Sequence, residues 1–559
     1  MALSKPATAP QHSEPIHTAA AGYADEYAKG DLDRREFLAR ATSLGLSAFA
    51  AYGLIGLSAP TQATAQTKMG GTLRIESTVK ALRDPRTYDW PQMSNFTRGW
   101  LEYLVEYNSD GTFRGILLDS WTVNDDATQY VLKVRQGVTW NDGSPFTAAD
   151  VAYNITRWCE KKVEGNSMAS RMASLIDEKT ETAREGAITV TDDATVTLSL
   201  ASPDITLIAG FSDYPAAIVP QGFEGDPLTS PKGTGPYLPE TYQPGVKAVL
   251  VKNEDHQWWG KGVIGEAALD RIEYIDYGTD QATIVTAADS DEIDMLYESL
   301  GDFIQILDGM GMKKSEAITA NTLVTRPNQQ AEVDGKKPYA DVRVRQAMAM
   351  AVDNARCLSL GYSDLGTVAE NHHVCPIHPE YAKMDQPKHD PKAALALLEE
   401  AGMADHEFEI ISIEDDWRRN TSDVIAAQFR EAGFNVKRTV LPGSTFWNDW
   451  AKYPLSTTDW AQRPLGVQVL ALAYRSGEAW NESGFANEEF DKLLAEALSI
   501  ADADKRRAVM ERLQAIMQEQ GVVIQPYWRS TYRHYKDGVT GAEMHPTFEI
   551  HVYKLGWAA

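Results

Sequence analysis

The sequence predicts an α/β protein with mixed sheets, because short strand-like runs and longer helical runs follow one another along the chain. The strand-like runs cover residues 198–200, 246–252 and 271–277, and the helical runs cover residues 281–300, 391–401, 420–432 and 488–520. The sequence shows no internal repeat. We therefore expect neither a closed barrel nor a helical bundle.

The first 66 residues have the features of an export signal. Residues 33–38 read DRREFL and resemble the twin-arginine export motif, and residues 63–65 read ATA, an A-x-A cleavage site before Gln66. Between them, residues 44–57 form a weakly apolar run of about 14 residues, shorter than the roughly 20 residues of a membrane-spanning helix. We expect residues 1–66 to be a twin-arginine-type signal peptide and the mature protein to be periplasmic.

Charge and cysteine content exclude several classes of protein. The chain carries 79 Asp and Glu residues against 53 Lys and Arg residues, a net charge of -26 that argues against nucleic-acid binding. Three cysteines, Cys159, Cys357 and Cys375, are too few for a disulfide framework. Cys357 and Cys375 could pair in an oxidising periplasm; in the alternative, the cysteines are small buried residues.

Residues 121–154 predict a strand, a turn and a helix in succession. Residues 130–135 alternate between apolar and polar positions, as in a strand with one buried face. Residues 142–143, Asp-Gly, supply a turn. Thr147 and Asp150 then form a capping box at the start of a helix, because each side chain can accept a hydrogen bond from a free backbone N–H. The buried face of this helix is expected to carry Val151, Ile155 and Trp158.

Two further stretches have distinctive amino-acid sequences. Residues 232–260 read KGTGPYLPETYQPGVKAVLVKNEDHQWWG, a Gly-Pro turn followed by a strand. Residues 338–354 read PYADVRVRQAMAMAVDN, in which Asp341 can cap a helix. The apolar stripe of that helix comprises Val344, Ala347, Met348, Ala351 and Val352.

Together these stretches closely resemble the family 5 extracellular solute-binding proteins, the dipeptide, oligopeptide and nickel receptors of bacterial ABC importers. The resemblance extends from about residue 70 to the C-terminus. It implies a two-lobed periplasmic-binding-protein fold with an extra subdomain in the first lobe. The first lobe would comprise residues 67–328 and 523–559, with the subdomain near 110–220, and the second lobe residues 329–522. Crossovers near residues 326–338 and a return strand at 521–528 would form a hinge.

The resemblance also implies where the ligand binds. Residues 84–104 resemble the first-lobe loop that runs beside the ligand backbone in oligopeptide receptors, and residues 457–463 match the second-lobe segment that reads G-W-x-x-D in peptide receptors. Trp460 keeps the aromatic residue of that motif. The expected ligand-binding residues are Asp89, Trp90, Pro91, Trp460, Gln462, Arg463, Trp480 and Asn481.

Arg463 departs from the family pattern, because the matching aspartate of peptide receptors pairs with the ligand's α-ammonium group. A buried arginine facing an ammonium would cost several kcal/mol. Its planar guanidinium instead suits a carboxylate or phosphate. In the alternative, Arg463 pairs with Asp459 or another acid, or points to solvent. Aromatic residues that can line a cleft crowd the same region, namely Trp447, Trp450, Tyr453, Trp460, Tyr474 and Trp480.

Residues 371–378, NHHVCPIH, are the one segment rich in metal-binding side chains. His372, His373, Cys375 and His378 could bind zinc, copper or nickel by residue type. Their spacing matches no common zinc motif, and adjacent histidines in an extended loop point apart. The alternative is a proline-bounded loop with hydrogen-bonded histidines.

No catalytic or nucleotide-binding motif such as G-x-S-x-G, H-E-x-x-H or a phosphate loop occurs. The function that we predict is therefore that of a receptor and not of an enzyme. It would be monomeric and without a cofactor, and would deliver a small polar ligand, a peptide or modified amino-acid derivative, to an ABC permease in the inner membrane. The alternatives are a nickel-type metal-chelate receptor of the same family and, from another class, a hydrolytic enzyme.

Overall fold

The computed structural model of the chain describes residues 17–57, 67–500 and 502–559. The predicted cleavage site at residues 63–65 lies outside the described residues.

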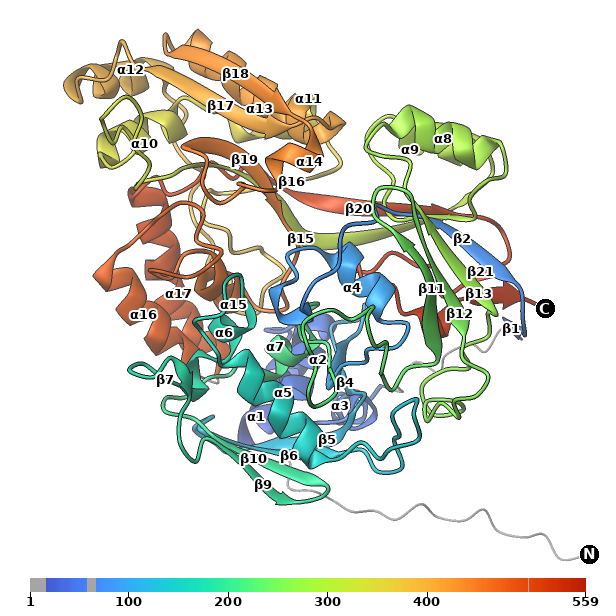
Figure 1. Ribbon diagram of the computed structural model, residues 1–559. Helices are drawn as coiled ribbons and strands as arrows, with labels where there is room; N and C mark the ends of the chain where they lie inside the picture. The colour runs from blue at the N-terminus through green and yellow to red at the C-terminus, as the bar shows by residue number, and fades with distance from the viewer. Residues whose placement is uncertain (1–16, 58–66, 501) are drawn as a thin grey trace, which may run out of the picture.

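A mixed sheet of eleven strands runs through the molecule (Figure 1). Its order is β11-β12-β13-β2-β14-β20-β15-β19-β17-β18, and β16 pairs with β20 beside this path. The first group comprises β11 (Tyr237–Gln243), β12 (Lys247–Lys252), β13 (Arg271–Ile275), β2 (Thr72–Glu76) and β14 (Met295–Leu296). The others are β20 (Tyr527–Tyr535), β15 (Lys313–Pro327), β19 (Leu455–Trp460), β17 (Glu407–Ile413), β18 (Asn435–Leu441) and β16 (Gly366–Val368). Parallel and antiparallel pairs both occur, so the predicted mixed-sheet α/β class is confirmed.

Strands β15 and β20 lie in the middle of this sheet and join its two halves. We call the half built on β11, β12, β13, β2 and β14 the first lobe and the half built on β19, β17 and β18 the second lobe. Helices α8 (Gln281–Asp289) and α9 (Phe303–Gly309) lie beside the first lobe (Figure 1). The second lobe carries α10 (Val342–Met350), α11 (Asn354–Tyr362), α12 (Pro391–Glu400) and α13 (Asp416–Glu431).

Helix α10 begins as the sequence predicts. The Asp341 carboxylate accepts a hydrogen bond from the N–H of Arg343 (2.9 Å) and caps the helix. All five residues of the predicted apolar stripe are buried in one cluster with α11, α12, α13 and β17. This cluster is the core of the second lobe.

A four-stranded antiparallel sheet, in the order β5-β6-β10-β9, forms a separate layer below the main sheet (Figure 1). Its strands are β5 (Leu118–Val123), β6 (Gln129–Val134), β10 (Thr195–Ser199) and β9 (Ile188–Asp192), and helices α5 (Ala148–Trp158), α6 (Met168–Arg171) and α7 (Leu207–Ser212) accompany it. The predicted capping box starts α5, with the Asp150 carboxylate accepting from the N–H of Thr147 (2.9 Å). Short strands β3 (Val105–Tyr107) and β4 (Phe113–Gly115) lead into this layer, and β7 (Ile176–Asp177) pairs with β8 (Thr182–Ala183).

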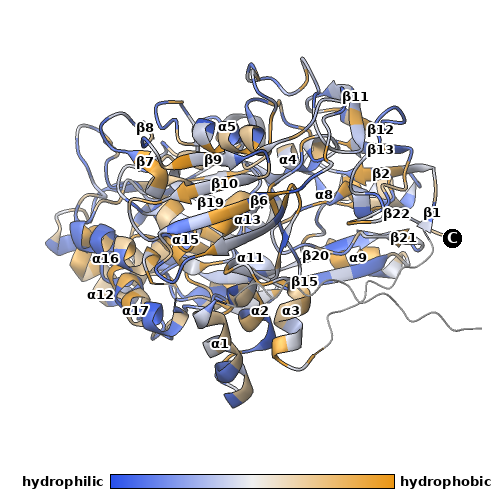
Figure 2. Ribbon diagram, turned by 90° about the horizontal axis from the view of Figure 1, so that it is seen from below, coloured by the Kyte–Doolittle hydropathy of each residue, from blue (hydrophilic) through white to orange (hydrophobic). Residues whose placement is uncertain are grey.

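Helices α15 (Gly466–Ala473), α16 (Glu488–Leu498) and α17 (Ala503–Glu519) pack beside the second lobe. Helix α15 is fully buried, whereas α16 and α17 lie at the edge of the molecule and carry hydrophilic and hydrophobic residues together (Figure 2). A single helix over 488–520 is therefore a wrong prediction. Asp502 starts a new helix by accepting from the N–H groups of Asp504 and Lys505, which interrupts the pattern.

Two other element predictions are corrected. The helix expected over 281–300 ends at Asp289, because Asp291 takes a left-handed φ of 62° and the chain then enters β14. The return strand expected at 521–528 is β20, which begins only at Tyr527. Three short strands, β1 (Thr67–Lys68), β21 (Val539–Thr540) and β22 (Gly556–Ala558), form a small sheet near the C-terminus.

The N-terminal segment forms three helices, α1 (Thr18–Lys29), α2 (Arg34–Ser43) and α3 (Ala48–Leu54), which pack against the body of the protein. Thr42 Oγ1 accepts from the N–H of Phe113 (2.9 Å), and Trp121 Nε1 donates to the Ser43 carbonyl (3.2 Å). Arg40 reaches the Pro379 carbonyl on the second lobe (3.0 Å). The segment thus contacts the region of the four-stranded layer and the second lobe. The assignment of residues 1–66 as a signal peptide and the predicted lobe boundaries stay predictions.

All three cysteines are buried and free, so Cys357 and Cys375 form no disulfide and the buried-residue alternative holds. Among the described residues, no helix has both the length and the apolar character that crossing a bilayer requires.

Candidate functional site

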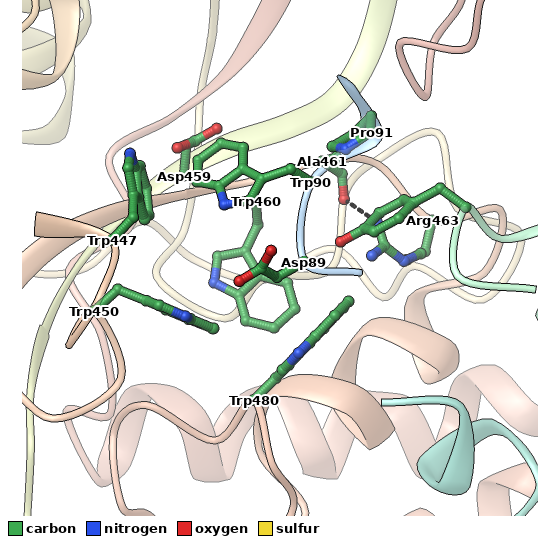
Figure 3. Close-up of a pocket in the computed structure, with 11 residues that line it drawn as sticks. Asp89, Trp90, Pro91, Trp447, Trp450, Asp459, Trp460, Ala461, Arg463 and Trp480 are labelled. Carbon is green, nitrogen blue, oxygen red and sulfur yellow. Dashed lines mark hydrogen bonds between the residues drawn. The ribbon is translucent and has the colours of Figure 1, made fainter. Parts of the chain in front are cut away.

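A cavity of about 60 Å³ lies between the two lobes and is lined mainly by aromatic side chains (Figure 3). Its walls come from the start of α4 (Pro91–Thr97), from Tyr214 shortly after α7, and from the end of β19. The loops that follow α14 (Gly443–Phe446) and α15 complete them. The lining residues are Asp89, Trp90, Pro91, Tyr214, Trp447, Trp450, Asp459, Trp460, Ala461, Arg463 and Trp480. Six of the eight residues expected at the ligand site therefore meet in one place.

Trp90 forms one side of the cavity. Pro91 occupies the first turn of α4, where a proline suits the helix, and Trp90 precedes it in extended conformation. The Trp90 ring packs edge-on against Trp447, with ring centroids 4.1 Å apart. The Lys80 Nζ lies 4.3 Å from the Trp90 centroid, a cation–π contact. Burial lowers the pKa of Lys80 to about 8.

Trp460, the last residue of β19, is held by a buried polar network. Its Nε1 donates to the Glu482 carboxylate (2.8 Å), which also accepts from the Thr458 hydroxyl (2.7 Å). Arg326 Nε lies 2.7 Å from the same carboxylate. The Trp480 ring packs against Trp460 at a centroid distance of 5.8 Å. The orientation of Trp460 is thus set by Glu482 and Trp480 of the loop after α15, and Glu482 is in turn held by Thr458 of β19 and Arg326 of β15.

Arg463 lies at the side of the cavity opposite Trp447 (Figure 3). Its Nε is 3.0 Å from Asp213 Oδ2, and Arg171 Nε donates to the same oxygen (2.9 Å). Both guanidinium groups also lie over the Trp480 ring, at 5.7 and 4.9 Å from its centroid. Burial opposes ionisation of Asp213, but the two arginines hold its pKa below the usual value. Arg463 therefore both lines the cavity and pairs with an acid, although the acid is Asp213 and not Asp459.

Positive charge predominates slightly around this cavity. Asp89 pairs with Arg83 (2.7 Å), and Asp459 pairs with Arg418 (2.8 Å), which also pairs with Asp415. Lining residues and their immediate partners comprise five cationic side chains, Lys80, Arg83, Arg171, Arg418 and Arg463, and four carboxylates, Asp89, Asp213, Asp459 and Glu482. This excess contrasts with the net charge of -26 of the whole chain.

Gln462 and Asn481 do not line the cavity. Gln462 Oε1 accepts from the N–H of Ala320 (2.9 Å), and its backbone N–H donates to Asn321 (2.6 Å), so the side chain faces β15. Asn481 Nδ2 donates to the carbonyls of Arg475 (3.0 Å) and Phe485 (2.8 Å) and fixes the loop that carries Trp480. Gln462 and Asn481 therefore fix the segments that carry the lining residues and do not themselves face the cavity.

Five lining residues were not among those expected from the sequence, namely Tyr214, Trp447, Trp450, Asp459 and Ala461. The crowding of tryptophans between residues 447 and 480 was a signal for two of them. Asp459 and Ala461 flank Trp460 and could have been included on that ground. Tyr214 has no comparable local signal.

The histidine-rich loop is buried and internally bonded. His373 Nδ1 lies 2.6 Å from the Tyr474 hydroxyl, and His372 Nδ1 accepts from the N–H of Val374 (3.2 Å). His378 Nδ1 accepts from the N–H of Cys375 (3.0 Å). Burial lowers the pKa of His372 to about 3 and that of His378 to about 4. In the described part of the chain, no group of three or more His, Cys, Asp or Glu side chains is arranged to hold a metal ion.

Residues 112–482 match the model of the bacterial extracellular solute-binding proteins, family 5. The chain belongs to this family. As a family 5 protein it is a solute-binding receptor of an ABC importer and not an enzyme, as the sequence predicts.

The names of related proteins mention peptides and also other ligands. A probable peptide ABC transporter periplasmic-binding protein of Sinorhizobium fredii is 27% identical over 72% of this chain and 77% of its own length. A glutathione-binding protein of Salmonella typhi is 24% identical over 75% of this chain and 81% of its own.

Solved structures of family 5 type share the two-lobed fold. The binding protein DppA of Helicobacter pylori, solved with the peptide STSA, has a TM-score of 0.76 at 18% identity and covers 88% of this chain and 99% of its own. AgaA of A. tumefaciens R10, solved with agropinic acid, has a TM-score of 0.76 at 22% identity with the same coverage. These similarities confirm the predicted two-lobed α/β fold.

Proposed function

We propose that this family 5 receptor binds a small ligand with an accessible carboxylate, a peptide or modified amino-acid derivative, in the aromatic cavity between its lobes. The observation that supports the proposal is the Arg463–Asp213–Arg171 cluster, in which two buried guanidinium groups share one carboxylate. A second anion would balance the remaining positive charge. An ammonium group at this position would face two cations.

Arg463 has hydrogen-bonding capacity left for a ligand. Its Nη1 donates to the carbonyls of Ala461 (2.9 Å) and Gln462 (3.1 Å), and its Nε faces Asp213. Its Nη2 has no hydrogen bond to any residue that the structure describes. A carboxylate would accept from these free N–H groups in a charge-assisted bond. The tryptophan rings would pack against the apolar part of the ligand.

Two comparisons support this ligand class, because glutathione and agropinic acid are both acids. Cation–π contacts add a further argument. Lys80 already occupies the face of Trp90, and the two arginines already lie over Trp480, so these aromatic faces are not open to a cationic ligand. A cation would compete with the protein's own side chains.

The test is a thermal-shift screen with succinate, glutathione, dipeptides and ethanolamine, followed by calorimetry. A ligand at about 100 times its Kd stabilises by about 2.7 kcal/mol. Arg463→Ala should weaken the acidic ligands by about 2–5 kcal/mol, the range for truncating one partner of a buried charge pair. Arg512→Ala, on exposed α17, is the matched control. If Arg463→Ala binds the acids as tightly as the unaltered protein, the proposed ligand class is wrong.

We also propose the cellular route of the protein. It would be exported through the twin-arginine pathway on the strength of the DRREFL motif, act as a periplasmic monomer, and present its ligand to a permease in the inner membrane. Its lobes, residues 67–328 with 523–559 and residues 329–522, would close on the ligand about the crossovers at β15 and β20.

A further inference from the structure

A second cavity of about 120 Å³ adjoins the aromatic one. The two share part of their lining, Trp90 and Pro91 from the first lobe and Asp459 and Ala461 from the second. The remaining walls again come from both lobes, with Glu76 at the end of β2 on one side and Trp417 at the start of α13 on the other. The cleft between the lobes therefore has two adjoining compartments, and the partition is the Trp90–Pro91 turn against the end of β19.

The second compartment is lined by polar atoms without protein partners. Gln92 Oε1 and Trp417 Nε1 are both buried, and neither has a hydrogen-bond partner among the described residues. Gln92 follows Pro91 in the first turn of α4, and the Trp417 ring contacts the guanidinium groups of Arg418 (4.6 Å from its centroid) and Arg529 (3.7 Å). A buried acceptor or donor without a partner destabilises the free protein. A bound group that donates a hydrogen bond would satisfy the Gln92 acceptor.

The charge of this compartment is opposite to that of the first. Four carboxyl groups line it, those of Glu76, Glu298, Asp415 and Asp459. Arg418 pairs with two of them, and Arg529 pairs with Glu298. Glu76 is buried and accepts one hydrogen bond, from the N–H of Tyr297 (3.2 Å), and no cationic side chain of the described chain lies within 4.0 Å of it. Glu76 is thus the carboxyl group that lacks a cation.

We propose that the second compartment is a subsite for a protonated amine of the ligand, held by Glu76 and Gln92. The proposal rests on the proposed function, in which the carboxylate of the same ligand meets Arg463. The ligand would then be amphoteric, with its acid beside the tryptophans and its amine beyond the Trp90–Pro91 turn. This orientation is the reverse of the one that an aspartate at position 463 would impose. Burial raises the pKa of Glu76 to about 8, and an incoming ammonium would favour the ionised carboxylate.

The first test is a soak of crystals of the whole protein with ethylammonium and, separately, with acetate. Ethylammonium should bind in the second compartment with its nitrogen within hydrogen-bond distance of Glu76 and Gln92, and acetate should bind at Arg463. Ordered water alone in the second compartment, or the amine at another place, overturns the inference. Absence of acetate at Arg463 refutes the proposed anion site instead, so the two failures are distinguishable.

The second test is in solution and uses γ-aminobutyrate with its monofunctional counterparts butyrate and butylamine. Calorimetry should show γ-aminobutyrate binding at least about tenfold more tightly than butyrate, an advantage of about 1.4 kcal/mol. Glu76→Gln should abolish that advantage and leave butyrate binding unchanged, and Gln92→Leu, whose folding is checked by its melting curve, should reduce it. Equal affinities for γ-aminobutyrate and butyrate in the unaltered protein contradict the amine subsite.

Discussion

Asp213→Asn should lower the stability of the free protein and raise its affinity for acids at the same time. The substitution keeps the shape of the side chain but removes the charge that Arg171 and Arg463 share. Both arginines then lose their ionic partner inside the protein. A ligand carboxylate at the cavity would become their counterion.

The magnitude follows from the geometry. Two unit charges 3.0 Å apart, the separation of Arg463 Nε from Asp213 Oδ2, attract by about 5–6 kcal/mol at an effective dielectric constant of about 20. Relief of the buried carboxylate's own desolvation offsets part of this loss. The expected net cost is about 3–5 kcal/mol of unfolding free energy. Affinity for succinate should rise by about 1.4 kcal/mol or more, a tenfold change.

Denaturant unfolding and calorimetry with succinate test both halves of this prediction. Asp119→Asn is the control, because Asp119 is an exposed acid paired with a single arginine at 3.1 Å, and its loss should cost less than about 1 kcal/mol. If Asp213→Asn is destabilised but binds succinate no more tightly, the shared carboxylate does not compete with the ligand. A ligand anion would then not act as the counterion of Arg171 and Arg463.

Three further predictions follow from the same residues and from the N-terminus. Trp460→Ala should weaken acidic and neutral ligands by similar factors in calorimetry, because it removes packing and no formal charge from the ligand site. Affinity for succinate should fall as the pH rises through about 8, because Lys80 then loses its proton and its positive charge, whereas Lys80→Met should bind with little pH dependence over this range. Replacing Arg34 and Arg35 by lysine should block export of the precursor, as followed by cell fractionation.

Each of these has a contradicting result. A loss confined to acids in Trp460→Ala would mean that the substitution acts through Glu482 and its arginine partner, which Trp460 contacts. An unchanged succinate Kd between pH 7 and 9 would mean that the charge of Lys80 does not act on the bound succinate. Undiminished export of the lysine variant would indicate a route other than the twin-arginine pathway.

Local sequence patterns predicted the elements that depend on local chemistry. The capping box at Thr147 and Asp150 and the Asp341 cap stand where the sequence places them, because each is satisfied by backbone groups within three residues. The prediction of a helix over 281–300 is wrong beyond Asp289, because residues 295–296 form β14 instead. This strand is stabilised by its neighbours β2 and β20, which are distant in sequence. Long-range pairing of this kind leaves no periodic signal.

The site could be predicted only in part for the same reason. Resemblance to the family indicated Trp90, Trp460 and Arg463, which lie on three sides of one cavity. Gln462 faces away because its side chain and its backbone N–H bond to Ala320 and Asn321 of β15, which are distant in sequence. Asp213, the partner of Arg463, lies 250 positions earlier in the chain, so no local pattern could pair the two.

The position of β20 determines when this protein can fold. Strand β20 (Tyr527–Tyr535) follows every other strand of the main sheet in the chain, yet it lies at the centre of that sheet, between β14 and β15. Its partner β15 lies roughly 200 residues earlier in the chain and cannot complete its pairing until β20 has been synthesised. Contacts between segments so far apart in sequence slow folding. Nascent chains that do not yet include Tyr527–Tyr535 therefore have two unjoined half-sheets with open edges.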